Sequence, residues 1–503
     1  MSLSLDAIGG AQAIAAFVAY LLVVLGIGAF STRFSSGGVS EFFVGGRRMH
    51  RFVVALSAVV SGRSAWLLLG VTGMAYARGA SAVWAVVGYI VVELLLFLYY
   101  APRLRRFSET YDCITVPDFF AERFEDRSGA LRSVLAIVIL VFMVGYVAGQ
   151  FVGGGKAFAA GFGLQPTTGV LLTAAIVLAY TVLGGFLAVS LTDMIQALFM
   201  ILALVALPVI AIADAGGLGV VVDELRTIDP TLIDPLALSA GVGIGFVGIG
   251  LGSPGNPHIL ARYMSIDDPD QLRYSAVVGT VWNVLMAAGA LFIGLAGRAY
   301  FPEVSMLPGG DTENLYPLLA QQHLPPVLFG IVVASIFAAI MSTADSQLLV
   351  AASAVVRDVY EQVWRRGDEV SQRKLVALSR LAVVGLVLLA LAFGLLADQL
   401  VFWLVLFAWA GLGAALGPTS ILALFWRRTT RAGVLAGVLV GTVTTVVWYL
   451  VPALKSRMYE LVPAFAAALA ATVIVSLLTS PPRDAADMLR AMSPDRSKTG
   501  PTP

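Results

Sequence analysis

The chain is poor in charge and in the side chains from which most enzyme centres are built. Only 13% of its 503 residues are charged, against about 25% in a soluble domain, and 59% are hydrophobic. Its one cysteine, Cys113, excludes an intrachain disulfide and a cysteine-rich metal centre. No HExxH or GxSxG pattern occurs, so the machinery of a membrane protease or lipase is missing. We therefore expect that the chain is not an enzyme.

The balance of charge excludes a second class of function. The 32 basic and 31 acidic residues leave a net charge of +1, and no basic run of the kind that binds nucleic acid is present. The N-terminus carries Asp6 and has no basic stretch, so we expect its first apolar segment to be a membrane span and not a cleaved signal peptide.

Long apolar segments make up most of the chain. One crossing of a bilayer takes ~20 apolar residues over ~30 Å of hydrocarbon, and thirteen segments meet this requirement. They are 10–30, 52–76, 80–101, 130–161, 166–185, 190–213, 238–262, 275–300, 327–363, 376–396, 399–426, 432–452 and 459–479. This pattern predicts an all-α integral membrane protein with a transmembrane domain over 1–480. We expect residues 481–503 to be a disordered cytoplasmic tail.

Basic residues are divided unevenly between the two sets of connections. If the N-terminus lies outside, the cytoplasmic segments hold 25 Lys and Arg, and the outer segments hold 5. The positive-inside rule then predicts an external N-terminus and a cytoplasmic C-terminus. We expect a multi-pass protein of the plasma membrane, which is the inner membrane in a bacterium.

Arg63 interrupts the second predicted span beside three weak helix formers, Ser61, Gly62 and Ser64. A charge at bilayer depth costs roughly 2.5–3.5 kcal/mol on insertion scales, so it normally faces a bundle interior or a watery cavity. One interpretation is an unwound segment over 60–64 whose free carbonyls bind a cation. The alternative is a kinked helix in which Arg63 pairs with an acid for packing alone. The cost of the charge favours the first.

The ninth predicted span carries a second polar cluster. Ser342, Asp345 and Ser346 follow the i, i+3, i+4 spacing of one helix face, and Thr343 is adjacent. Hydroxyl and carboxylate oxygens are ligands that suit a hard cation. Small hydroxyl residues also pack in helices by bonding to the preceding turn, but four polar groups within five residues favour a path for an ion or a solute.

The sixth predicted span contains a carboxylate that spacing alone does not place. Asp193 is either a solvated residue near a helix start, where Ser190 would form a capping pair with it, or a group inside the bundle. Both interpretations stay open at this point.

A second interrupted helix is predicted over 245–258, where five glycines and two prolines prevent a regular helix. It comes about five spans after the first interruption, a spacing that matches inverted repeats of five helices with the site at their interface. Tyr146 lies in a glycine-rich helix, where it either faces a substrate or packs.

Three segments of the chain resemble the solute:sodium symporter family, and the resemblance extends over about 10–480. They are GGFLAVSLTD at 184–193, GNPHILAR at 255–262 and MSTADSQLL at 341–349. The resemblance implies a LeuT-like inverted repeat of five plus five helices, with core repeats at about 52–213 and 238–426. It also implies a symporter that couples sodium influx to uptake of a small organic solute, namely an amino acid such as proline or another small carboxylate or polar metabolite.

The resemblance further implies two positions for co-transported ions. The first, for sodium, consists of the carbonyls of Val60, Arg63 and Ala339 and the hydroxyls of Ser342 and Thr343. Some members hold a second ion, at positions that are Asp193, Ser342, Asp345 and Ser346 here. Asp345 replaces a hydroxyl, and its charge either strengthens cation binding or lets a proton substitute.

The pocket departs from the pattern of the proline carriers. Those carriers have Asp, Met and Trp where this chain has Gly62, Arg63 and Ile249, whereas Ser64, Trp66 and Tyr146 are retained. The resemblance implies a solute site formed by Gly62, Ser64, Ala65, Trp66, Tyr146 and Ile249. Arg63 can take the place of a sodium ion, bind a solute carboxylate or neutralise Asp345.

Two alternatives remain open from the sequence. One is a proton-coupled or sodium-independent transporter, and the other is a solute sensor with a transporter body. We expect a small solute and the lipid bilayer as partners, no nucleic acid, and a monomer sufficient for transport.

Overall fold

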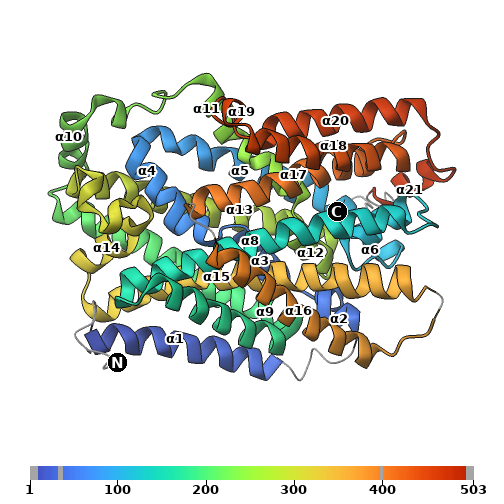
Figure 1. Ribbon diagram of the computed structural model, residues 1–503, viewed down its shortest axis with the longest axis horizontal. Coiled ribbons are helices and arrows are strands. Elements are labelled where there is room, and N and C mark those ends of the chain that lie inside the picture. The colour runs from blue at the N-terminus through green and yellow to red at the C-terminus, as the bar shows by residue number, and fades with distance from the viewer. Residues whose placement is uncertain (1–9, 32–37, 367, 397–399, 494–503) are drawn as a thin grey trace, which may run out of the picture.

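A computed structural model describes residues 10–31, 38–366, 368–396 and 400–493, and every regular element within these ranges is helical. Ten helical segments are long and apolar enough to cross a membrane, and three shorter apolar helices accompany them. The long helices lie side by side along the long axis of the molecule (Figure 1). The predicted all-α membrane fold is confirmed, while the count of thirteen crossings and the five-plus-five repeat stay predictions.

Most helix bounds agree with the predicted spans to within a few residues, although α15 ends at Ser353 and a π-helical segment over Ala354–Trp364 completes the predicted span. The long helices are α1 (Gly10–Ser31), α5 (Val83–Leu95), α8 (Ala130–Phe162), α9 (Pro166–Asp214), α13 (Leu272–Tyr300), α15 (Pro326–Ser353), α16 (Gln372–Leu395), α17 (Val401–Phe425), α18 (Arg431–Leu450) and α20 (Leu461–Leu478). Position 399, the first of one predicted span, lies outside the described residues.

Short helices gather at the two ends of the bundle (Figure 1). Helices α10 (Leu218–Ile228) and α14 (Leu315–His323) lie at one end, and α2 (Val39–Val44), α6 (Ala101–Thr110) and α21 (Ala485–Ala491) lie at the other. The positive-inside rule makes the same division, because it assigns the first two to outer loops and the other three to the cytoplasm. The sidedness itself stays a prediction.

The predicted interruption of the second span is present. Helix α3 (Arg51–Ser61) ends before Gly62, and Ser64 adopts a left-handed backbone with φ 49°. The chain then continues through a wide π turn over Trp66–Val71 into α4 (Thr72–Arg78). A side chain rarely adopts a positive φ without support from its surroundings, so the break is built into the packing around it.

The second predicted interruption is also present. Helix α11 (Ala240–Gly248) gives way to a 3₁₀ segment over Ile249–Gly255, and α12 (Pro257–Ser265) follows. A β-carbon at Gly252 would overlap the indole of Trp409 on α17. Glycine is therefore required here because α17 packs directly against the broken backbone.

The predicted fifth and sixth spans are both present, because the stretch labelled α9 consists of two helices that meet at Gly185, where the backbone is not helical (φ 61°, ψ −174°), and their apolar parts are Pro166–Val182 and Gly184–Asp214. One segment differs from expectation. The predicted disordered tail contains α21, and it buries Met488 and Met492. Residues 494–503 of that tail lie outside the described residues.

Candidate ion and solute site

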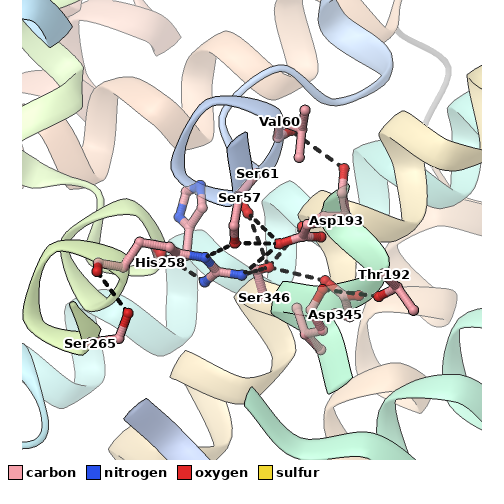
Figure 2. Close-up of polar contacts among 12 residues, drawn as sticks. Ser57, Val60, Ser61, Thr192, Asp193, His258, Ser265, Asp345 and Ser346 are labelled. Carbon is pink, nitrogen blue, oxygen red and sulfur yellow. Dashed lines mark hydrogen bonds and ion pairs between the residues drawn. The ribbon is translucent and has the colours of Figure 1, made fainter. Parts of the chain in front are cut away.

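The end of α3 meets the middle of α15 inside the bundle. Ser342 Oγ lies 3.4 Å from the carbonyl oxygen of Val60 and 3.2 Å from that of Ala339. Figure 2 shows the contact at Val60. The hydroxyl of Thr343 is fully buried and has no hydrogen-bond partner among the described residues. Because a buried polar group without a partner is costly, this orphan hydroxyl points to a ligand.

The carbonyl of Arg63 is less free than the sequence pattern implied. It accepts a hydrogen bond from the Leu67 amide at 3.0 Å, and the Val60 carbonyl accepts one from the Arg63 amide at the same distance. A carbonyl oxygen has two lone pairs, so the Arg63 carbonyl retains one, whereas the Val60 carbonyl is also in contact with Ser342. The structure therefore brings together Val60, Ala339 and Ser342, with Thr343 next to Ser342 on α15 and Arg63 at the edge of the group.

Asp193 lies inside the bundle and not at a helix start. Its Oδ2 accepts a hydrogen bond from Ser57 Oγ at 2.6 Å and a longer one from Ser61 Oγ at 3.4 Å (Figure 2). Ser346 Oγ lies 3.4 Å from Ser61 Oγ and donates to Asp345 Oδ1 at 3.0 Å. Three of the four residues implied for a second ion, Asp193, Asp345 and Ser346, thus belong to one buried cluster, and the fourth, Ser342, accepts a hydrogen bond at its carbonyl from Ser346 Oγ at 2.7 Å.

Arg262 completes this cluster, although no role for it was predicted from the sequence. Its guanidinium bonds Ser346, lies 3.4 Å from Asp193 Oδ2, and donates to Ser57 Oγ at 3.1 Å. Arg262 is the last residue of the GNPHILAR segment, and it was counted among the 25 basic residues assigned to the cytoplasmic side by the positive-inside rule. Its position on the interrupted span was the signal that could have found it.

The charges of the cluster do not balance. Asp193 and Asp345 are fully buried beside one arginine, and Asp193 Oδ1 and Asp345 Oδ2 have no partner among the described residues. Two carboxylates and one guanidinium leave one negative charge. A buried charge without a partner is strongly unfavourable, so the cluster suits one further cation.

Arg63 pairs with Glu93 of α5, and the expectation that it neutralises Asp345 is wrong. Its Nη2 contacts Glu93 Oε2, its Nε donates to Asn283 Oδ1 at 2.7 Å, and its guanidinium lies 3.9 Å from the ring centre of Tyr89. Glu93 was missed, although an acid in an apolar span carries the same signal as Arg63.

A small cavity lies beside this ion pair. It is lined by Gly62, Arg63, Trp66, Tyr89, Tyr146, Ile249 and three residues of α17. The space open to the centre of a water molecule is about 10 Å³, which is room for roughly one water. A solute therefore fits only when the walls move apart, as they do in a carrier that alternates between states.

Four of the six residues predicted for the solute line this cavity, and two do not. Ser64 Oγ accepts a hydrogen bond from the Trp66 amide at 3.1 Å, and the Ala65 amide donates to Gln150 Oε1 at 3.0 Å. These two residues hold the shape of the break beside the cavity.

A larger pocket lies between α11, α17 and the segment that connects α18 to α20. The space in this pocket that is open to the centre of a water molecule is about 240 Å³, and its walls include Arg78 and Glu460. It shares Ile249 and Leu406 with the small cavity. The two spaces therefore lie on either side of these two side chains.

Buried ion pairs surround α7 (Val116–Arg123). Arg132 Nη1 bonds Asp118 and lies 2.9 Å from Asp358 Oδ1, which also accepts from Thr115 Oγ1 at 2.8 Å. Burial alone would raise the pKa of Asp118, but the charges of Arg357 and Arg132 hold it below its usual range. The network links α7, α8 and the π-helical segment Ala354–Trp364 that follows α15.

Comparisons with known proteins agree with this geometry. The model of the sodium:solute symporter family matches residues 42–441. The high-affinity proline transporter PutP of Bacillus subtilis is 38% identical over 461 residues, which are 91% of this chain and 96% of PutP. The osmoregulated proline transporter OpuE of the same species is 36% identical, with 93% and 94% covered. A sodium/proline symporter of Staphylococcus aureus is 35% identical, with 92% of each chain covered.

Solved structures show the same fold. The substrate-bound, outward-open state of a Na⁺-coupled sialic acid symporter superposes with a TM-score of 0.79 at 20% identity, covering 94% of this chain and 99% of that one. Mhp1, a nucleobase-cation-symport-1 family transporter in a closed conformation, gives a TM-score of 0.53 at 13% identity, with 91% and 99% covered. Both are transporters of the LeuT-like type. The chain belongs to the sodium:solute symporter family, whose members carry a small solute across the membrane together with sodium.

Proposed function

We propose that this chain takes up proline, or a closely similar small amino acid, together with sodium. Three relatives of 35–38% identity are proline transporters by name. The observation that carries the proposal is the contact of Ser342 with the Val60 carbonyl at the end of α3, next to the unpartnered buried hydroxyl of Thr343 in the sequence and two residues before Gly62, which lines the solute cavity. Sodium binds there to the carbonyls of Val60, Arg63 and Ala339 and to the two hydroxyls.

Coupling follows from the elements that each ligand joins. Sodium ties the break after α3 to α15, and the solute ties the same break to the 3₁₀ segment and to α17. Both ligands therefore stabilise the same closed arrangement, and each raises the affinity for the other. One sodium ion crossing 100 mV supplies about 2.3 kcal/mol, enough to concentrate a solute ~50-fold.

A second cation binds between Asp193 and Asp345, where one negative charge is left over beside Arg262. The hydroxyl of Ser346 and the free carboxylate oxygens are its ligands. Oxygen ligands of this kind accept sodium, and the carboxylate of Asp345 also accepts a proton. The stoichiometry of transport therefore depends on this cluster.

The transporter works as a monomer with its N-terminus outside the cell. All the residues assigned to the ions and the solute come from one chain, and the larger pocket with Arg78 and Glu460 lies at the predicted outer end. Proline enters from that side, and the ion pairs around Asp118 separate in the inward-open state.

The test is uptake of labelled proline by proteoliposomes that contain the purified protein. An inward sodium gradient is expected to drive accumulation, and a negative interior potential set with potassium and valinomycin is expected to increase it. Ser342→Ala combined with Thr343→Ala should raise the sodium requirement while the protein stays folded. Uptake that does not depend on sodium and is driven instead by a pH gradient would refute sodium coupling for this chain.

A further inference from the structure

Arg63 lines the solute cavity and forms an ion pair with Glu93, which lies behind the cavity wall. Their side chains are 1% and 3% exposed, and the face of the Tyr89 ring covers the guanidinium. We propose that Glu93 determines solute specificity, because with Arg63 it forms a charge pair that selects solutes carrying both a carboxylate and a cationic nitrogen. This inference rests on the proposed function and assigns the recognition of the solute's charges to two residues.

One oxygen of Glu93 is held and the other is free. Oε2 contacts Arg63 Nη2 and accepts from Asn283 Nδ2 at 2.8 Å, whereas Oε1 is buried without a partner among the described residues. The free oxygen lies 3.7 Å from the place that a β-carbon of Gly62 would occupy, and Gly62 lines the cavity. Because Gly62 has no side chain, only this glycine stands between Oε1 and the cavity, and a cationic group can approach Oε1 when the cavity walls move apart.

The guanidinium also has donors to spare. Of its five N–H groups, one binds Asn283, one binds Glu93 and one makes a long contact of 3.3 Å to the Gly62 carbonyl. The remaining donors can hold a solute carboxylate in the planar geometry that arginine favours.

The electrostatics of burial favour a zwitterion over either half of it. Arg63 and Glu93 cancel each other, so the wall carries two opposite charges and no net charge. A solute with only a carboxylate draws Arg63 away from Glu93 and leaves the acid unbalanced. A solute with only an amine draws Glu93 away from Arg63 and leaves the guanidinium unbalanced. An unbalanced buried charge is strongly unfavourable, whereas a zwitterion leaves none.

The experiment compares three ring compounds of nearly equal size by calorimetric binding to the purified full chain in saturating sodium. Proline carries both charges, tetrahydrofuran-2-carboxylate lacks the cationic nitrogen, and pyrrolidine lacks the carboxylate. We expect the wild type to bind proline at least 30-fold more tightly than either analogue. Wild-type protein that binds the furan carboxylate as tightly as proline would overturn the inference.

The variant Glu93→Gln leaves Arg63 without its acid. We expect its preference for proline over the furan carboxylate to fall at least 10-fold, because an anion now balances the guanidinium. The matched control is Glu313→Gln, which removes another buried acid from its pair with Lys156 (2.6 Å) on an outer loop. It should keep the wild-type ratio of affinities. The same ratio in Glu93→Gln as in wild type would show that Glu93 plays no part in selection.

A second variant covers the case in which Glu93→Gln fails to fold. Arg63→Met combined with Glu93→Gln removes both charges and leaves neither unpaired. It is expected to lose discrimination among the three compounds, and retention of the wild-type preference would overturn the inference. If the wild type binds no amino acid at all, the proposed function falls; if it binds proline in a sodium-dependent way and the variants keep its selectivity, only this inference falls.

Discussion

Removal of one hydroxyl from the sodium site should weaken sodium binding by a calculable amount. Ser342→Ala deletes the side chain that joins Val60 of α3 to Ala339 of α15, and Thr343→Ala deletes the unpartnered neighbour. A polar contact to a charged group is worth about 1.5–3 kcal/mol. This loss corresponds to an increase of about 10- to 150-fold in the sodium concentration for half-maximal uptake. Uptake at saturating sodium should change far less, because the solute cavity is intact.

The assay is initial proline uptake in proteoliposomes over a wide range of sodium at constant ionic strength. Thr343→Ser keeps the hydroxyl and should stay close to wild type. Ser335→Ala removes a buried hydroxyl from the same helix, where it contacts Tyr316 at 3.0 Å, and should leave the sodium dependence unchanged. Wild-type sodium dependence in both alanine variants would refute the assignment of this site.

Three further predictions follow from the buried charges. Burial raises the pKa of the Cys113 thiol well above its usual value, so this single cysteine should react slowly with maleimide. Asp118→Asn weakens the ion pairs around α7 and should increase the rate of labelling at least 10-fold. The pKa of Asp118 is lowered in the folded protein, so its ionised carboxylate stabilises the fold above pH 3.8, the ordinary pKa. This stabilisation is lost as the pH falls through the lower pKa of the folded state. The melting temperatures of wild type and Asp118→Asn, measured from pH 3 to 7, should therefore converge at the acid end. Asp345→Asn removes one ligand of the second cation and should lower the Hill coefficient for sodium in uptake, and an unchanged coefficient would place that ion elsewhere.

Local signals in the sequence predicted the break at Gly62 and the polar face of α15. An arginine among apolar residues and four polar groups at helical spacing each carry their meaning within a short segment. The interruption over 245–258 was predictable for the same reason, because glycine and proline alter the conformation of the backbone at their own positions.

Partners across the bundle could not be predicted in this way. Arg262 reaches Asp193 over 69 residues, and Glu93 reaches Arg63 from a neighbouring helix. Which charges meet depends on the rotation and depth of packed helices, and hydrophobic length fixes neither.

The most direct test of the shared ion and solute site is reciprocal binding by the purified protein. Proline affinity is measured with sodium and with potassium, and sodium affinity is measured with and without proline. We expect sodium to tighten proline binding at least 10-fold and proline to tighten sodium binding by the same factor, as linkage requires. Equal proline affinity in sodium and in potassium would contradict a sodium ion held between Val60 and Ser342 beside the solute.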